Sequence, residues 1–189
     1  MKLVLLKTPF LMAIYELFDI ISTEIIGERP FQVNAYLAGG AAVHLYNSSR
    51  SSNDVDTVFS PPVHINDVVV HYIDEEQRKR TLAYDPTYFA KLGLIHPDYQ
   101  KDARQVWRKN NLTLHVLSPV DIAVTKIARF LPRDKEDISE LAAKELLTPE
   151  LLEKRANEAM DYFIGNTAML KYNIQDACDL VRQNFKKQG

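Results

Sequence analysis

Cysteine is almost missing from this chain, and neither sign of charge dominates it. A single cysteine, Cys178, stands among 189 residues, so no disulfide can form within the chain. It lies in the helix-like run DACDLV, where a buried, unreactive thiol is the favoured interpretation. Lysine and arginine total 23 against 25 aspartates and glutamates, which gives no global electrostatic case for binding nucleic acid or an anionic membrane. We expect a protein of the cytoplasm.

Long hydrophobic runs are also missing. The apolar N-terminal segment resembles a secretory signal, but no small-residue cleavage site follows it, and four residues interrupt it: Lys7, Pro9, Glu16 and Asp19. The longest uncharged stretch is far below the roughly 20 residues that span a bilayer, so we expect no membrane partner. Thr8 instead caps a predicted packing helix that Gly27 and Pro30 close.

The pattern along the chain predicts an α+β fold. Strand-like segments come first, around one short helix, at residues 31–38, 54–59, 67–86 and 112–117, the third of these being an antiparallel hairpin. Residues 88–107 predict a loop and a short helix. From Ser118 the period becomes helical, with helices that open on Pro119, Pro132 and Pro149 and a last one in the tail.

This order predicts a small mixed β-sheet flanked by an N-terminal helix and a helical C-terminal half. Residues 1–117 would form the α+β core, and residues 118–189 would pack on it as one compact unit. A hydrophobic content of 46% suffices for one core, and two independent domains would be cramped in 189 residues.

The stretch YLAGGAAVHLYNSSRSSNDVDTVF carries the first candidate site. Side chains alternate along a strand, so Asp54 and Asp56 are expected on the same face, where a divalent cation would relieve their repulsion. Gly39 and Gly40 form a turn that lets backbone N–H groups approach an anion, and the dipole of the following helix adds to the attraction. Either feature alone is typical of a surface strand or a simple turn. In this order they favour a metal and triphosphate site.

A second candidate constellation lies about 70 residues later. Lys126 occupies the apolar stripe of its predicted helix, and Asp134 and Asp137 lie three residues apart on the next helix. One interpretation is a lysine that extends to solvent, with solvated acidic residues. The other pairs Lys126 with phosphate oxygens or with the carboxylates of the strand. The residues alone leave both open.

These motifs together resemble a known family. The segment G-G-A-A-V, then Arg50, then D-V-D, and later a helix with a lysine followed by R-D-x-x-D-I, is similar to the nucleotidyltransferase superfamily. Within it, the strings LSPVDIAVTKIARF and DKEDISELA resemble an uncharacterised branch of the minimal nucleotidyltransferase-like families that include abortive-infection toxins. The resemblance covers nearly the whole chain.

The resemblance implies that a nucleoside monophosphate passes from a nucleoside triphosphate to a hydroxyl of RNA or protein, with pyrophosphate leaving. A further implied role is the toxin of a toxin–antitoxin pair, with a cognate antitoxin as partner. Asp54 and Asp56 would hold Mg²⁺ or Mn²⁺, and Gly39 and Gly40 would cradle the β and γ phosphates. The other implied residues are the cations Arg50, Lys126 and Arg133 for the nucleotide, and Asp137 with Asp134 to complete the site.

Three positions depart from the pattern or leave it open. Ala41 stands where many relatives carry a serine or threonine hydroxyl for phosphate. The predicted strand at 112–117 offers no third acid, and Asp85 is the candidate for a third metal ligand, with a simple turn aspartate before Pro86 as the alternative. His115 in that strand is favoured as a satisfied core histidine over a ligand.

Two other functions stay open from the sequence. Ala41 favours a non-catalytic nucleotide-binding or interaction module of the same fold. A nucleic-acid adaptor would use the basic cluster Arg78, Lys79 and Arg80. That cluster follows three acidic residues at a predicted hairpin turn, so a solvated turn is the favoured interpretation.

Overall fold

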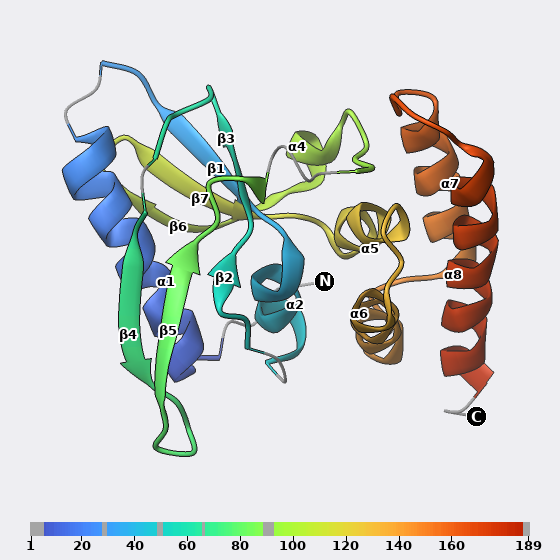
Figure 1. Ribbon diagram of the computed structural model, residues 1–189, viewed down its shortest axis with the longest axis horizontal. Helices are drawn as coiled ribbons and strands as arrows, with labels where there is room; N and C mark the ends of the chain where they lie inside the picture. The colour runs from blue at the N-terminus through green and yellow to red at the C-terminus, as the bar shows by residue number, and fades with distance from the viewer. Residues whose placement is uncertain (1–5, 28–29, 49–50, 66, 89–92, 187–189) are drawn as a thin grey trace. The chain divides into compact units, whose positions relative to one another are not determined.

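The computed structural model describes residues 6–27, 30–48, 51–65, 67–88 and 93–186. It confirms the α+β class, with strands concentrated before residue 118 and helices after it (Figure 1). The chain divides into two compact units, Met1–Lys91 with Ala103–Leu117, and Leu92–Asp102 with Ser118–Gly189. Residues 92–102 therefore go with the helices. That the two units form a single body stays a prediction.

Helix α1 (Pro9–Ile20) forms as the sequence predicts. The Thr8 hydroxyl accepts a hydrogen bond from the Leu11 N–H at 3.1 Å, and Pro9 opens the helix. A π-helical segment, η1 (Ile21–Ile26), continues it to Gly27, whose φ of +50° suits a residue without a side chain. The inward face is apolar and includes Ile14, Leu17 and Phe18, which are fully buried.

The first unit contains a four-stranded sheet. Its strands, in spatial order, are β3 (Thr57–Ser60), β1 (Val33–Leu37), β7 (Leu112–Val116) and β6 (Arg104–Lys109). β1 and β7 are parallel, and the other two pairs are antiparallel, so the sheet is mixed as predicted. Alternate residues of β1 and β7 point into the core and are fully buried: Val33, Ala35, Leu37, Leu112, Leu114 and Val116.

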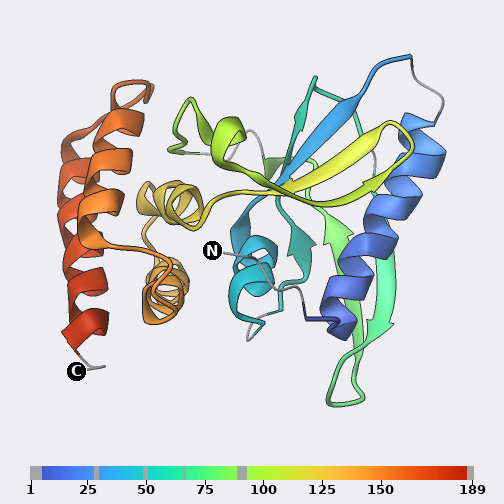
Figure 2. The same ribbon diagram turned by 180° about the vertical axis from the view of Figure 1, so that it is seen from behind.

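Strand β6 corrects the prediction of a loop and a short helix for residues 88–107. Tyr99–Asp102 forms the predicted short helix, α4, but Arg104 begins a strand that pairs with β7. β6 is an edge strand with mostly exposed or half-buried side chains, so it lacks an apolar alternation. Figure 2 shows the β6–β7 hairpin beside α1, where Trp107 faces Phe18 and Lys109 pairs with Asp19 at 2.5 Å.

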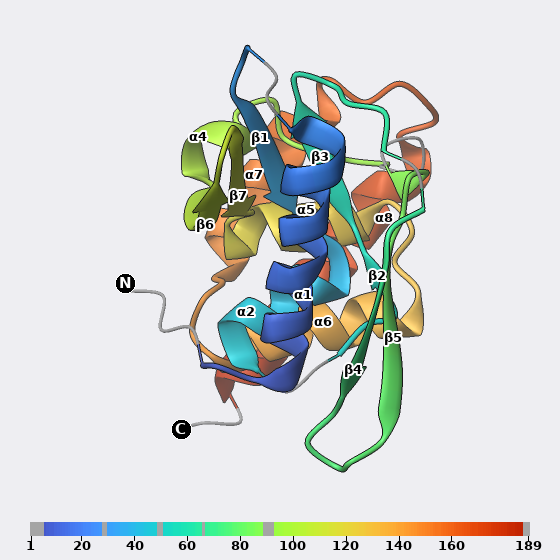
Figure 3. The same cartoon turned by 90° about the vertical axis from the view of Figure 1, so that its left-hand side faces the viewer.

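The second sheet of this unit has three strands. Its spatial order is β2 (Asp54–Val55), β5 (Lys79–Tyr84) and β4 (Val69–Ile73). β4 and β5 form the predicted antiparallel hairpin, and α1 packs against both (Figure 3). β2 pairs with β5 in parallel, with Val55 opposite Tyr84.

The predicted single strand at 54–59 is two strands in different sheets. Asp54–Val55 belongs to the three-stranded sheet, Thr57–Ser60 pairs with β1, and Asp56 lies at the junction. The single-strand prediction was wrong because the residue pattern on either side of Asp56 is continuous. The choice of pairing partner, which only the folded chain decides, changes there.

In its described part the second unit contains α4 and four longer helices. The proline signals predicted the starts of α5 (Pro119–Ile127), α6 (Pro132–Ala143) and α7 (Pro149–Met160), and α8 (Ala168–Lys186) is the predicted tail helix. Ser118 and Thr148 cap α5 and α7 by accepting a backbone N–H three residues on. Cys178 on α8 is buried, and burial raises the pKa of its thiol to about 11. The prediction of a buried thiol is confirmed.

Candidate active site

Three carboxylates meet where the two sheets of the first unit adjoin. Asp54 begins β2, Asp56 follows β2, and Asp85 follows β5; one oxygen of each lies within 4.8 Å of the others. The cause is the parallel pairing of β2 with β5, in which the Asp85 N–H donates to the Val55 carbonyl oxygen at 3.2 Å and brings Asp85 level with Asp56. The structure thus brings together the three acids predicted as metal ligands.

The Gly39 turn closes directly onto one of these carboxylates. Gly39 has a φ of +59°, and a Cβ added there would lie 1.8 Å from Asp56 Oδ2. The Ala38 N–H also donates to the Asp56 carbonyl oxygen at 2.9 Å, which holds the turn and the junction together. Only glycine combines this backbone conformation with this close approach.

Helix α2 (Gly39–Asn47) begins at this turn. Its N-cap residue, Ala38, makes no side-chain hydrogen bond to the first turn, whose N–H groups have no acceptor within the helix. Gly40 and Ala41 are buried in that turn. The positive end of the helix dipole therefore lies beside the carboxylate of Asp56, as a polyphosphate with its cation would need.

Two hydroxyl residues that were not predicted from the sequence, Ser52 and Thr87, hold the carboxylates. The Ser52 hydroxyl donates to Asp54 Oδ1. Thr87 donates to Asp85 Oδ1 through its hydroxyl at 2.6 Å and its N–H at 2.8 Å. The signal that could have found them is a serine or threonine two residues from an aspartate, a common local turn pairing.

Burial and charge also affect the tyrosine beside Asp85. Burial, with a smaller contribution from the Asp85 charge, raises the pKa of the Tyr84 phenol, so this group stays neutral next to the site. Its ring packs edge-on against Phe59, at 5.8 Å between centroids.

The helical unit holds the second candidate constellation. Lys126 is 5% exposed, and its ammonium pairs with Asp137 and lies 3.7 Å from Asp134 Oδ1. Both aspartates are fully buried, so the picture of a solvent-extended lysine with solvated acids does not hold. Asp134 also accepts a two-point contact from Arg129, at 2.9 and 2.7 Å.

The electrostatics of Asp134 follow from these contacts. Burial acts to raise the pKa of this carboxyl, but hydrogen bonds from Arg129 and the Leu131 N–H, together with the Lys126 charge, outweigh it and lower the pKa. Asp134 therefore stays ionised in the folded state.

Arg129→Gln is expected to lower the free energy of unfolding at pH 7 by about 1–2 kcal/mol, because a two-point, charge-assisted contact is lost. The lowered folded pKa of Asp134 stabilises the fold above the unfolded value of about 4, and this contribution is lost as the pH falls through the folded pKa. The difference between the two proteins should therefore shrink below about pH 4. The difference in the free energy of unfolding is measured by urea denaturation, with the circular dichroism of the helices as the signal.

The exposed neighbour Arg133 supplies the control. Arg133→Gln should change the free energy of unfolding by no more than about 0.5 kcal/mol, as exposed substitutions usually do. Equal stability of the Arg129→Gln variant and the unsubstituted protein at pH 7, or a difference that grows on acidification, would contradict the assignment.

The remaining predicted site residues are placed as follows. Arg133 is exposed at the start of α6, and Arg50 lies outside the described residues. His115 is half-buried; it shares a 3.1 Å hydrogen bond with Asn34, stacks on Tyr36 at 5.1 Å, and has a pKa that burial lowers. These contacts agree with a satisfied histidine. Among the described residues, three or more possible metal ligands gather only at Asp54, Asp56 and Asp85.

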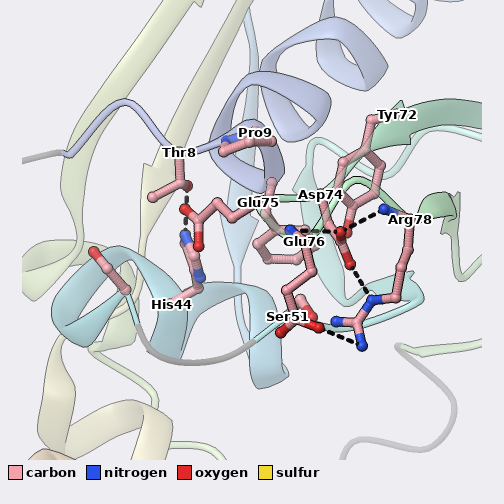
Figure 4. A pocket seen from close by; sticks show the side chains of 11 residues that line it. Thr8, Pro9, His44, Ser51, Tyr72, Asp74, Glu75, Glu76 and Arg78 are labelled. Atoms are coloured by element: carbon pink, nitrogen blue, oxygen red, sulfur yellow. Dashed lines mark hydrogen bonds and ion pairs between the residues drawn. The ribbon is translucent and has the colours of Figure 1, made fainter.

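A small pocket of about 140 Å³ lies between α1, α2 and the β4–β5 turn (Figure 4). Thr8 and His44 share a 2.7 Å hydrogen bond on one side of it. On the other side Arg78 pairs with Asp74 at 2.9 Å and with Glu76 at 2.6 Å, and Arg80 also pairs with Asp74. The arginines of the basic cluster are thus neutralised locally, which favours a solvated turn over a nucleic-acid surface.

None of the helices in the described part of the chain is both long enough and apolar enough to cross a bilayer. A search of curated proteins finds no match. Residues 15–188, however, match the family described as nucleotidyltransferase of unknown function (DUF6036), and the chain therefore belongs to this nucleotidyltransferase family.

Proposed function

We propose that this protein is a cytoplasmic, metal-dependent nucleotidyltransferase that transfers a nucleoside monophosphate from a nucleoside triphosphate to a hydroxyl of RNA or protein. The observation that carries the proposal is the convergence of Asp54, Asp56 and Asp85 beside the Gly39 turn. Membership of the nucleotidyltransferase family supports it at a coarser level.

The donor set fits Mg²⁺ or Mn²⁺. Carboxylate oxygens are the ligands that these hard cations prefer, and three carboxylates with oxygens within 4.8 Å repel one another unless a cation lies among them. Asp54, Asp56 and Asp85 would hold the ion. When bound, it would neutralise charge on the phosphate oxygens and polarise the reacting phosphorus.

The glycine turn would bind the triphosphate. The N–H groups of Gly39, Gly40 and Ala41 stand at the start of α2, where the helix dipole favours an anion. In the transfer, the acceptor oxygen forms a bond to the α-phosphorus while the bond from that phosphorus to the pyrophosphate oxygen breaks. The acceptor proton leaves to a carboxylate or to solvent. Positioning and electrostatics suffice for such a step.

The resemblance to nucleotidyltransferases assigns roles to residues of the helical unit as well. Lys126 and Arg133 are assigned to the nucleotide, as is Arg50, and Asp137 with Asp134 is assigned to support of the site. Lys126 lies between two buried carboxylates, which fixes the position of its side chain, as a phosphate contact requires.

The test incubates the full-length protein with each of the four nucleoside triphosphates, labelled at the α-phosphate, with Mg²⁺ or Mn²⁺ and with or without total RNA. Pyrophosphate release together with label on RNA or on protein supports the proposal. Absence of both with every nucleotide and either metal would refute catalysis. For the toxin role, expression should arrest growth, and the Asp56→Asn variant should not.

Ala41 favours a second candidate, a module that binds nucleotide without turnover. Ala41 is fully buried and has no hydroxyl to offer a phosphate. Calorimetry with a non-hydrolysable triphosphate and Mg²⁺ separates the two, because a binding module gives heat of binding while the labelled assay stays silent.

A further inference from the structure

The two hydroxyl residues at the carboxylate cluster engage the same kind of atom. Ser52, 9% exposed, directs its hydroxyl to Asp54 Oδ1, and the Asp54 N–H lies 3.5 Å from the same hydroxyl oxygen. Thr87 gives Asp85 Oδ1 two donors, at 2.6 and 2.8 Å. On each carboxylate, donors from the chain therefore occupy one named oxygen.

This arrangement restricts how each carboxylate can meet a cation. A hydrogen bond to one oxygen restricts the rotation of the carboxylate plane and makes that oxygen less available as a metal ligand. With one oxygen engaged in this way, each acid would offer a cation a single ligand atom. A carboxylate held in this way is poorly suited to bidentate coordination of an ion.

Cations differ in their tolerance of this restriction. Mg²⁺ takes about six oxygens at about 2.0–2.1 Å in near-octahedral order, and single-oxygen carboxylates suit it. Ca²⁺ takes about six to eight oxygens at about 2.3–2.6 Å and often uses both oxygens of a carboxylate. The locked carboxylates should therefore discriminate between the two.

We propose that Ser52 and Thr87 are positioning residues that hold Asp54 and Asp85 in a single-oxygen presentation and so make the centre selective for Mg²⁺ or Mn²⁺ over Ca²⁺. The inference rests on the proposed function, since it concerns the metal centre of that reaction. It adds residues that act through the carboxylates and not on the substrate.

Substitutions of Ser52 and Thr87 should differ in how strongly they affect metal binding. The Ser52 hydroxyl is lost entirely in Ser52→Ala, so the orientation of Asp54 loosens. In Thr87→Val the hydroxyl is lost but the Thr87 N–H still donates to Asp85 Oδ1. The effect of Ser52→Ala should therefore exceed that of Thr87→Val, and Thr87→Ser, which keeps the hydroxyl, should bind metal as the unsubstituted protein does.

The experiment measures metal binding to the full chain without nucleotide. Mn²⁺ affinity is read from the paramagnetic resonance of the free ion, and Ca²⁺ affinity from calorimetry. Loss of a residue that orients a ligand typically weakens metal binding about 10- to 100-fold, and we expect this for Mn²⁺ in Ser52→Ala. Ca²⁺ affinity should change far less, so the ratio of Mn²⁺ affinity to Ca²⁺ affinity should fall. Ser51→Ala, at the exposed neighbouring serine, is the matched control and should leave both affinities unchanged.

The outcomes separate this inference from the proposed function. If the unsubstituted protein binds Mn²⁺ and Ser52→Ala binds it equally with unchanged selectivity, the positioning role is overturned and the metal centre stands. If the unsubstituted protein binds no Mn²⁺, the metal centre is overturned and this inference with it. If Ser52→Ala unfolds at a lower temperature in chelator, the comparison of Thr87→Val with Thr87→Ser decides, and equal Mn²⁺ affinities of those two overturn the proposal.

Discussion

Replacing Asp56 with asparagine is expected to lower pyrophosphate release by about 100- to 1,000-fold, the range typical of removing one group that stabilises transition-state charge. Asparagine keeps the shape of the side chain but removes its charge. Because Asp56 lies at the junction of β2 and β3 with Asp54 and Asp85 around it, the proposed function predicts that its loss weakens metal binding and displaces the phosphates. The labelled-nucleotide assay measures pyrophosphate release, and Mn²⁺ affinity is a second readout.

A matched control distinguishes this effect from a general loss of negative charge. Asp67 is an exposed aspartate of the same unit, outside the carboxylate cluster, and Asp67→Asn should keep full activity. Asp54→Asn should behave like Asp56→Asn. Turnover at the unsubstituted rate in both Asp54→Asn and Asp56→Asn would rule out the catalytic assignment of the cluster.

Gly39→Ala should disable the site and destabilise its unit together. Alanine at a φ of +59° is strained, and its Cβ would lie 1.8 Å from Asp56 Oδ2, so the turn and the carboxylate must move apart. Backbone strain and overpacking together are worth about 2–5 kcal/mol of the free energy of unfolding. Trp107, the single tryptophan, lies on β6 of this unit and reports its unfolding in urea by fluorescence. Activity should fall at least about 100-fold even where the variant is folded, because Asp56 is displaced.

Gly27 provides the control for backbone strain alone. It has a similar φ of +50°, but a Cβ there would meet nothing closer than the Thr23 carbonyl oxygen at 3.8 Å. Gly27→Ala should therefore cost only about 1–2 kcal/mol and leave activity intact. If Gly39→Ala and Gly27→Ala lose the same stability and both stay active, the close approach of the turn to Asp56 is not a feature of the working protein.

The carboxylate cluster illustrates how far local patterns reach. The spacing of Asp54 and Asp56 predicts that they share a face, and the glycine turn predicts a backbone that approaches an anion. For Asp85, the sequence left a metal ligand and a turn aspartate as alternatives. The structure shows both arrangements at once, because Asp85 accepts from Thr87 in a local turn and lies with the other two acids. Only the parallel pairing of β2 with β5 brings it there.

In the helical unit, too, the local sequence pattern does not identify which residues make contact. A lysine in an apolar stripe predicts a partner but does not name it. The packing of α6 against α5 supplies Asp134 and Asp137 and buries all three side chains. The helical periodicity did not decide whether these aspartates are buried or exposed, because charged residues are usually solvated.

By itself the sequence determined the mixed α+β character, the helix starts at Thr8, Pro119, Pro132 and Pro149, and the chemical types available for a site. These depend on caps, prolines and alternation, which act between residues close together in the chain. The tertiary structure alone decided that residues 54–60 divide between two sheets, that residues 104–109 form an edge strand, and that Asp85 lies beside Asp54 and Asp56. Strand pairing depends on partners distant in sequence, whose register no local pattern encodes.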